Sequence, residues 1–267
     1  MDRYFKTPYA HDFPALGAVL RLSTKYVVEH LRQHCLARLD LDWPATLAGW
    51  DEREAAASEQ GQYAPYPFWA HPILIVRLAL ELGIQTVFCS AMYDISRYAP
   101  SKIKIGAPPP ALVSPTLRPD LDIKAYSKQL VTLPADLLFR ALRGRERSQK
   151  YIAAFIENEL NFRPPSADCA NKFDAESPSQ ACRESFAIIM LCVLRSVGGV
   201  SYGRDADPLF SLLQAADMLT RTDFLDADQQ YCGLNLCLPC KIDVAAAVGR
   251  AREEVWALLP SWFGIQG

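Results

Sequence analysis

Residues 72–97 read PILIVRLALELGIQTVFCSAMYDISR, and this stretch decides the fold class. Its apolar side chains are so dense that a helix formed here must be buried on more than one side. We expect this helical segment to run from Pro72 to about Arg97. Gly83 interrupts the run and predicts a bend or a corner between two helices.

Residues 13–39 carry two apolar stripes at helical spacing. Because both stripes cannot lie on one face of a single straight helix, we expect two helices joined near residues 23–25. The first stripe finds few partners within the first forty residues. We therefore expect an exposed apolar surface there and self-association of the isolated chain. The residues concerned are Phe5, Tyr9, Leu16 and Leu20.

Helical patterns also fill the C-terminal half, at residues 134–160, 186–194, 208–220 and 243–259. Residues 186–194 are nine consecutive apolar residues, which is long for a strand and favours a buried core helix. Pro260 is expected to end the last helix. Convincing two-residue alternation is absent from the sequence. The predicted fold is all-α, a multi-helix domain with proline-rich loops.

The same patterns predict a domain organisation with two linkers. An N-terminal helical segment covers residues 1–43 and is followed by a linker at 44–71. A helical segment at 72–98 precedes a proline-rich linker at 99–131. Residues 132–267 form a C-terminal helical region with a cysteine-rich end.

Composition excludes several classes of protein. Half of the 267 residues are hydrophobic, so the chain can bury a sizeable core. The formal charge of −2 lacks the basic excess of a dedicated nucleic-acid binder. No apolar run approaches the roughly 20 residues of a membrane span. The first residues are not followed by the apolar segment that a secretory signal peptide needs. We expect an intracellular protein of cytoplasm or nucleus, not a secreted or membrane protein.

A set of short blocks in this sequence resembles a known group of proteins. The blocks are LRLSTKY at 20–26, HLRQHCLARL at 30–39, ALELG at 79–83, Leu133 through Arg147, CLPC at 237–240, and Gly249 through Gly264 with its Trp256 and Leu259-Pro260. Their order is similar to the last helices of a BTB/POZ domain and the BACK-like helical region that follows it in fungal BTB/POZ proteins. In that comparison, residues 1–43 correspond to the C-terminal helices of the BTB domain.

The resemblance implies a non-catalytic adaptor that binds other proteins. In such adaptors the strand-rich half of the BTB domain supports dimerisation and recruits a cullin-type ubiquitin ligase. Only about a dozen residues precede Phe13 here, so that half is absent from this sequence. A cullin-type partner is therefore expected only if a full BTB domain is restored upstream.

The eight cysteines pose a separate question, because six of them follow residue 168. Cys237 and Cys240 form a C-x2-C pair, the spacing that lets two thiolates reach one zinc ion. Cys169 and Cys182 are the candidate second pair, and Cys232 could replace either of them. Two interpretations stay open: reduced cysteines with no cofactor, or a zinc site formed by Cys169, Cys182, Cys237 and Cys240. The second would suit a small regulatory or nucleic-acid-binding module, our alternative function.

Other candidate sites are weaker. His30 and His34 are spaced like zinc ligands, but Leu31 stands where a zincin has its glutamate, which favours a polar helix flank. The basic run at residues 140–150 lacks interleaved aromatic residues and is interpreted as a solvated helix face. P-loops, nucleophile elbows and dinucleotide fingerprints are missing from the sequence. We therefore expect no enzyme activity and no catalytic residues.

Overall fold

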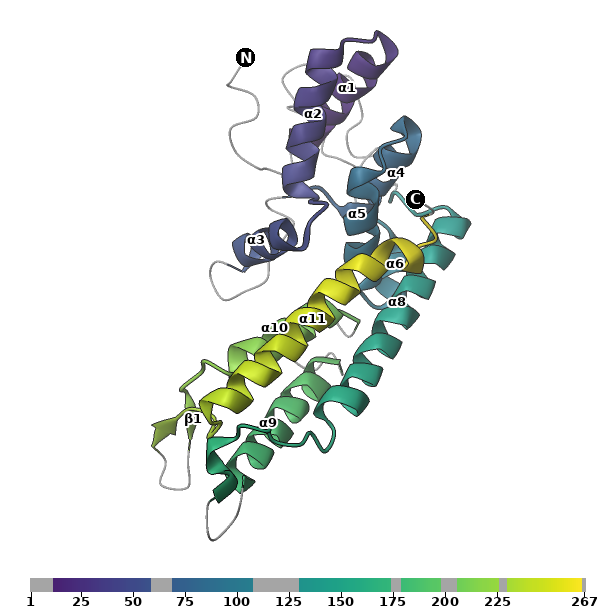
Figure 1. Ribbon diagram of the computed structural model, residues 1–267. Helices are drawn as coiled ribbons and strands as arrows, with labels where there is room; N and C mark the ends of the chain where they lie inside the picture. The colour runs from purple at the N-terminus through teal and green to yellow at the C-terminus, as the bar shows by residue number, and fades with distance from the viewer. Residues whose placement is uncertain are drawn as a thin grey trace. The chain divides into compact units, whose positions relative to one another are not determined.

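The computed structural model describes residues 12–58, 69–107, 130–173, 179–197, 206–225 and 230–265. Helices dominate these residues, which confirms the predicted all-α class (Figure 1). The helices are α1 (Phe13–Lys25), α2 (Glu29–Asp42), α3 (Leu47–Ala57), α4 (Pro72–Leu82), α5 (Thr86–Ser96), α6 (Pro100–Ile105), α8 (Ala135–Phe155), the π-helix η2 (Ile156–Leu160), the 3-10 helix η3 (Ala170–Phe173), α9 (Gln180–Val197), α10 (Pro208–Met218) and α11 (Leu238–Trp262). The one sheet among the described residues is an antiparallel ladder of β1 (Phe224–Leu225) and β2 (Tyr231–Cys232).

The chain divides into two compact units. Unit 1 comprises Met1–Ser96, Pro100–Leu142 and Phe263–Gly267, and unit 2 comprises Arg97–Ala99 and Arg143–Trp262. In unit 1, α1 packs on α2 and α4 packs on α5, as Figure 1 shows. In unit 2, α10 packs against both α9 and α11.

The helix boundaries in unit 1 follow the predicted corners. The 72–97 stretch splits into α4 and α5 at Gly83, whose φ of 66° lies in the left-handed region that favours glycine. Likewise, α1 and α2 are separated by residues 26–28, next to the predicted junction. Both predictions are confirmed.

The predicted exposed stripe on α1 is wrong. Leu16 and Leu20 are 4% and 0% exposed, because α1 packs against α4 as well as α2. A β-carbon added at Gly17 would lie 3.9 Å from the side chain of Leu78, which shows how closely α1 approaches α4. The other two residues of that prediction, Phe5 and Tyr9, lie outside the described residues.

Both predicted linkers contain a helix. Within 44–71, α3 begins after Thr46, whose side chain accepts a hydrogen bond from the Gly49 amide at 3.2 Å. Within 99–131, α6 occupies the segment Pro100–Ile105, and an isolated bridge joins Ala107 to Val131. Helix α3 was not predicted, because its many charged residues leave no clear apolar stripe in the sequence. Residues 59–68 and 108–129 lie outside the described residues.

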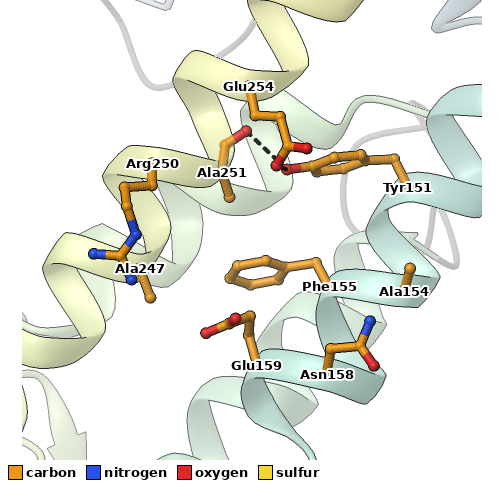
Figure 2. A pocket seen from close by; sticks show the side chains of 9 residues that line it. All are labelled: Tyr151, Ala154, Phe155, Asn158, Glu159, Ala247, Arg250, Ala251 and Glu254. Carbon is orange, nitrogen blue, oxygen red and sulfur yellow. Dashed lines mark hydrogen bonds between the residues drawn. The ribbon is translucent and has the colours of Figure 1, made fainter.

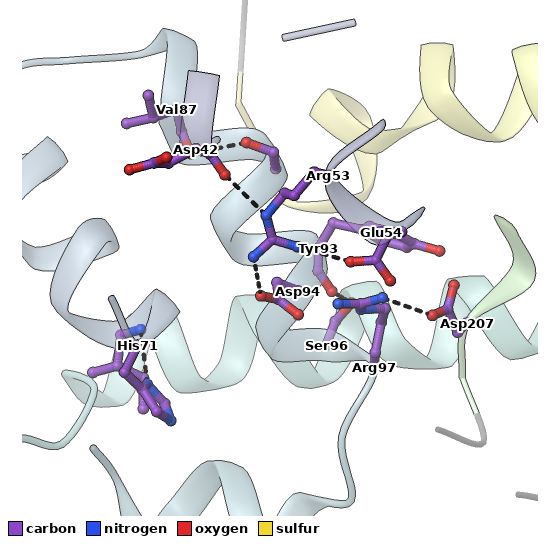
Figure 3. Close-up of polar contacts among 12 residues, drawn as sticks. Asp42, Arg53, Glu54, His71, Val87, Tyr93, Asp94, Ser96, Arg97 and Asp207 are labelled. Atoms are coloured by element: carbon purple, nitrogen blue, oxygen red, sulfur yellow. Dashed lines mark hydrogen bonds and ion pairs between the residues drawn. The ribbon is translucent and has the colours of Figure 1, made fainter. Parts of the chain in front are cut away.

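A buried arginine organises the aromatic core of unit 1. The guanidinium of Arg53 lies over three tryptophan rings, at 4.3 Å from the centroid of Trp43, 4.8 Å from Trp50 and 4.6 Å from Trp69. It also pairs with the carboxylate of Asp94 at 3.0 Å (Figure 3). Pairing and stacking together satisfy a charge that would otherwise be costly to bury.

Two helices of unit 2 differ from their sequence predictions. The nine-residue apolar run lies in α9, but α9 is not surrounded by core: Leu191 is 56% exposed. An unbroken apolar run carries no period, so it cannot show which face is buried. The last helix, α11, begins before residue 243 and continues through Pro260 to Trp262. A proline in the final turn removes a single backbone hydrogen bond, and the helix tolerates that loss.

Candidate metal centre

The structure brings the four predicted cysteines of unit 2 together from three segments. Cys169 lies between η2 and η3, and Cys182 is in the first turn of α9. Cys237 immediately precedes α11, and Cys240 is in its first turn. The three-residue spacing at a helix start places both of these thiols on the same side of α11.

The sulfur atoms have the separations that a tetrahedral site requires. All four lie within 4.8 Å of one another. The Sγ atoms of Cys169 and Cys182 are 3.8 Å apart, and those of Cys169 and Cys237 are 3.7 Å apart. Four thiolates bound to zinc at about 2.3 Å are about 3.8 Å from each other. All eight cysteines are free thiols, and these separations are too long for disulfide bonds.

The site is enclosed and supported by hydrogen-bond donors. Cys169, Cys182 and Cys240 are at most 1% exposed, and only Cys237 reaches solvent to an intermediate degree. Donors outside the cluster contact the sulfurs, among them the Ser166 amide to Cys240 at 3.4 Å, the Asn171 side-chain amide to Cys182 at 3.4 Å, and the Ser179 hydroxyl to Cys169 at 3.5 Å. Donors of this kind stabilise thiolates and orient them toward a metal.

The thiols do not ionise equally. Burial raises the pKa of Cys237, but the amides of Cys240 and Ala170 and the neighbouring thiols of Cys240 and Cys169 outweigh it and lower that pKa to about 6. Burial raises the pKa of Cys182 and of Cys240. The cluster therefore supplies a ready thiolate at Cys237, while Cys182 and Cys240 need a positive charge at the centre to ionise.

The donor set fits zinc. Four sulfur donors in a closed, mostly buried arrangement match a structural zinc site, which leaves no position for water or substrate. Cys232, the sequence alternative, is not a member of the cluster. Among the described residues, this is the one group of three or more histidine, cysteine or carboxylate side chains close enough to share an ion.

The other sequence candidates do not assemble a site. His30 and His34 are exposed on α2 and belong to no such cluster in the described part of the chain. In the basic run, Arg145 is 7% exposed and donates to the backbone oxygen of Tyr98, and Lys150 pairs with Glu146. The interpretation of this run as one solvated face is therefore wrong at Arg145.

Sequence reasoning missed a cavity of about 300 Å³ between α8, η2 and α11. In Figure 2 the hydroxyl of Tyr151 points to the carboxylate of Glu254, and it donates a hydrogen bond at 2.7 Å. Burial, and then this carboxylate, raise the pKa of Tyr151, so the phenol stays protonated and remains a donor. No local signal could have revealed this pair, because its members are 103 residues apart. The contact ties α8 to α11.

Comparisons with known proteins supply no relative: no family model, no curated protein and no solved structure matches the chain. The resemblance to BTB/POZ proteins therefore stays a prediction that rests on short helical blocks. Each of the described helices is too short or too polar to traverse a lipid bilayer.

Proposed function

We propose that the protein is a non-catalytic protein-interaction protein whose unit 2 is held together by a structural zinc ion. The observation that carries the proposal is the cluster of four cysteine sulfurs within 4.8 Å of one another. Bound zinc supplies positive charge and tetrahedral geometry, and four thiolates complete its coordination. The site is therefore suited to stabilising a fold and not to activating water.

The ligands would tie three separate segments of unit 2. Cys237 and Cys240 anchor the start of α11, Cys182 anchors the start of α9, and Cys169 anchors the segment before η3. The first turns of α9 and α11, which both pack on α10, would be held by one ion. Metal binding of this kind contributes directly to the free energy of folding.

The interaction role is supported by an apolar surface on unit 2. A groove of about 810 Å³ runs beside α9 and is lined by apolar side chains that include Leu191, Met218 and Phe224. Leu191 and Ile188 are 56% and 42% exposed. Exposed apolar residues gathered beside a groove are typical of surfaces that bind proteins. The alternative role in nucleic-acid binding has less support, because within the basic run Arg145 is buried and Lys150 is paired with Glu146.

Metal content tests the zinc role. Protein purified without chelator is expected to carry one zinc ion per chain by elemental mass spectrometry. Cys237→Ser and Cys240→Ser should each lose it, whereas Cys232→Ser should keep it because that sulfur lies outside the cluster. A wild-type chain that binds no zinc even when refolded with it would refute the role.

The adaptor version of the interaction role needs a second experiment. Mapping the 5′ end of the transcript shows whether a strand-rich BTB half is encoded upstream. The longest encoded protein is then titrated with a purified cullin-type ligase scaffold in a calorimeter. Heat of binding is the expected result, and its absence in the longest form would exclude cullin recruitment while leaving the zinc site intact.

A further inference from the structure

The exposed face of α9 has the spacing of a helix-pairing seam. Glu184, Ile188, Leu191 and Arg195 are separated by four, three and four residues. This is the a/d spacing that keeps one line of side chains facing a partner helix in a two-stranded coiled coil. All four are exposed, although the opposite face of α9 is buried in unit 2.

The ends of this seam carry opposite charges around an apolar centre. Glu184 accepts a hydrogen bond from the Gln180 side-chain amide at 2.8 Å. In the described part of the chain, neither Glu184 nor Arg195 forms an ion pair. When two copies of this helix run antiparallel, the order acid, apolar, apolar, base places each acid opposite a base and each apolar residue opposite an apolar residue.

We propose that the partner of this face is a second copy of the chain, with the two α9 helices antiparallel. A two-fold axis between residues 189 and 190 places Ile188 of each copy against Leu191 of the other. The same axis places Glu184 of each copy against Arg195 of the other. Such an interface is isologous, the commonest form of homodimer.

Charge selects this arrangement over its alternatives. A parallel pair in register would place Glu184 against Glu184 and Arg195 against Arg195, and like charges facing each other oppose association. Besides Arg195, the charged side chain that lines the groove is Arg221. It is paired with Asp223 through two contacts of 2.7 Å, which leaves Arg195 as the base suited to face Glu184.

The neighbouring groove adds contact area to the seam. It runs between α9 and the α10–β1 side of unit 2 and is lined by Cys192, Gln214, Met218 and Phe224 beside the seam residues. A second α9 lying on the seam would cover part of it and bury apolar surface that is now exposed. This inference rests on the proposed interaction role and names its partner, and the seam contains none of the four cluster cysteines.

Sedimentation equilibrium of the full chain tests the pairing. The wild-type chain is expected to dimerise reversibly, and Leu191→Glu to weaken dimerisation at least about tenfold by placing a charge in the apolar centre. Leu41→Glu is the matched control, since Leu41 is a leucine 71% exposed on α2, outside both the seam and the cysteine cluster. The control should dimerise as the wild type does.

Charge reversal tests the antiparallel register. Glu184→Arg and Arg195→Glu should each weaken the dimer, and the double variant should restore it because both ion pairs are rebuilt with reversed sign. A monomeric wild type, or a double variant no better than the singles, would overturn the proposal. Zinc content, measured on the same samples, should be unchanged, so failure of the dimer is distinguishable from failure of the metal site.

Discussion

The carboxylate of Asp94 accepts a hydrogen bond from the guanidinium of Arg53 at 3.0 Å, and both side chains are 1% exposed. The two residues are 41 positions apart and join α3 to α5. The other nitrogens of Arg53 donate to the backbone oxygen of Asp42 and to Glu54. The pair therefore attaches the short helix α3 to the core of unit 1.

Removal of this arginine should destabilise unit 1. Arg53→Met leaves Asp94 buried without its charge partner, which typically costs about 3–5 kcal/mol. Arg53→Lys should also destabilise, since an ammonium group cannot stack on three tryptophans as the planar guanidinium does. The measurement is urea unfolding followed by tryptophan fluorescence. Arg21→Met is the control: its pair with Glu81 is 49% and 48% exposed, so the loss should stay below about 1 kcal/mol.

Asp42 should make stability depend on pH. Burial raises its pKa from 3.8 to about 6, although Arg38 and Arg53 partly oppose this. Between these two values Asp42 holds its proton more tightly in the folded protein than in the unfolded chain, so its contribution to stability is fully present below about pH 4 and is lost as the pH rises to about 6. Asp42→Asn should remove this slope and add up to about 3 kcal/mol at pH 7. Urea midpoints at several pH values check this, with Asp40→Asn, an exposed position on α2, as control; an unchanged slope in Asp42→Asn contradicts the assignment.

Removal of the metal should loosen unit 2. If the proposed zinc ion is bound, a strong chelator is expected to lower the thermal midpoint and expose the four cluster thiols to a thiol reagent, because the ion would hold the starts of α9 and α11. Zinc should also dissociate as the pH falls, since protons compete for thiolates. Cys182→Ser should reproduce the chelator effect, whereas Cys192→Ser, on the same helix but outside the cluster, should not. Equal reactivity of all eight thiols before and after chelation would contradict this prediction.

Two glycines should respond to alanine in opposite directions. Gly83 has a φ of 66° with no atom within 4 Å of an added β-carbon, so the cost of Gly83→Ala is conformational alone, about 1–2 kcal/mol. Gly249 lies inside α11, also with open space around an added β-carbon. Gly249→Ala should therefore stabilise by about 0.5–1 kcal/mol. Chemical denaturation of both variants measures the two changes in the free energy of unfolding, which should have opposite signs.

The spacing of apolar residues and the positions of glycine and proline predicted much of this fold. The paired helices on either side of Gly83 and the helices α1, α2 and α10 follow from local patterns, which a sequence displays directly. The packing of α1 against α4 does not, because the two helices lie some sixty residues apart in the chain and no local pattern in α1 indicates α4. The pairing of Arg53 with Asp94 is hidden for the same reason.

The sequence indicated which four cysteines belong to the site, but not how they are arranged in space. The C-x2-C spacing of Cys237 and Cys240 is a local signal, and it pointed to a metal. The approach of Cys169 and Cys182 to that pair depends on how α9 and α11 pack, which spacing cannot show. The exposed side of α9 was missed because an apolar run has no polar residues to mark a surface.

The cysteine cluster also sets an order of events during synthesis. The sulfurs of Cys169 and Cys237 are 3.7 Å apart across 68 residues of chain. A ribosome that has released α9 has exposed two ligands, and the remaining two follow only with the first turn of α11. The four-cysteine cluster can therefore form only after Cys240 has left the ribosome, so a nascent chain that stops short of Cys237 cannot complete it. The thiols of such a truncated chain would stay exposed to solvent, so chaperones and proteases can recognise the chain as incompletely folded.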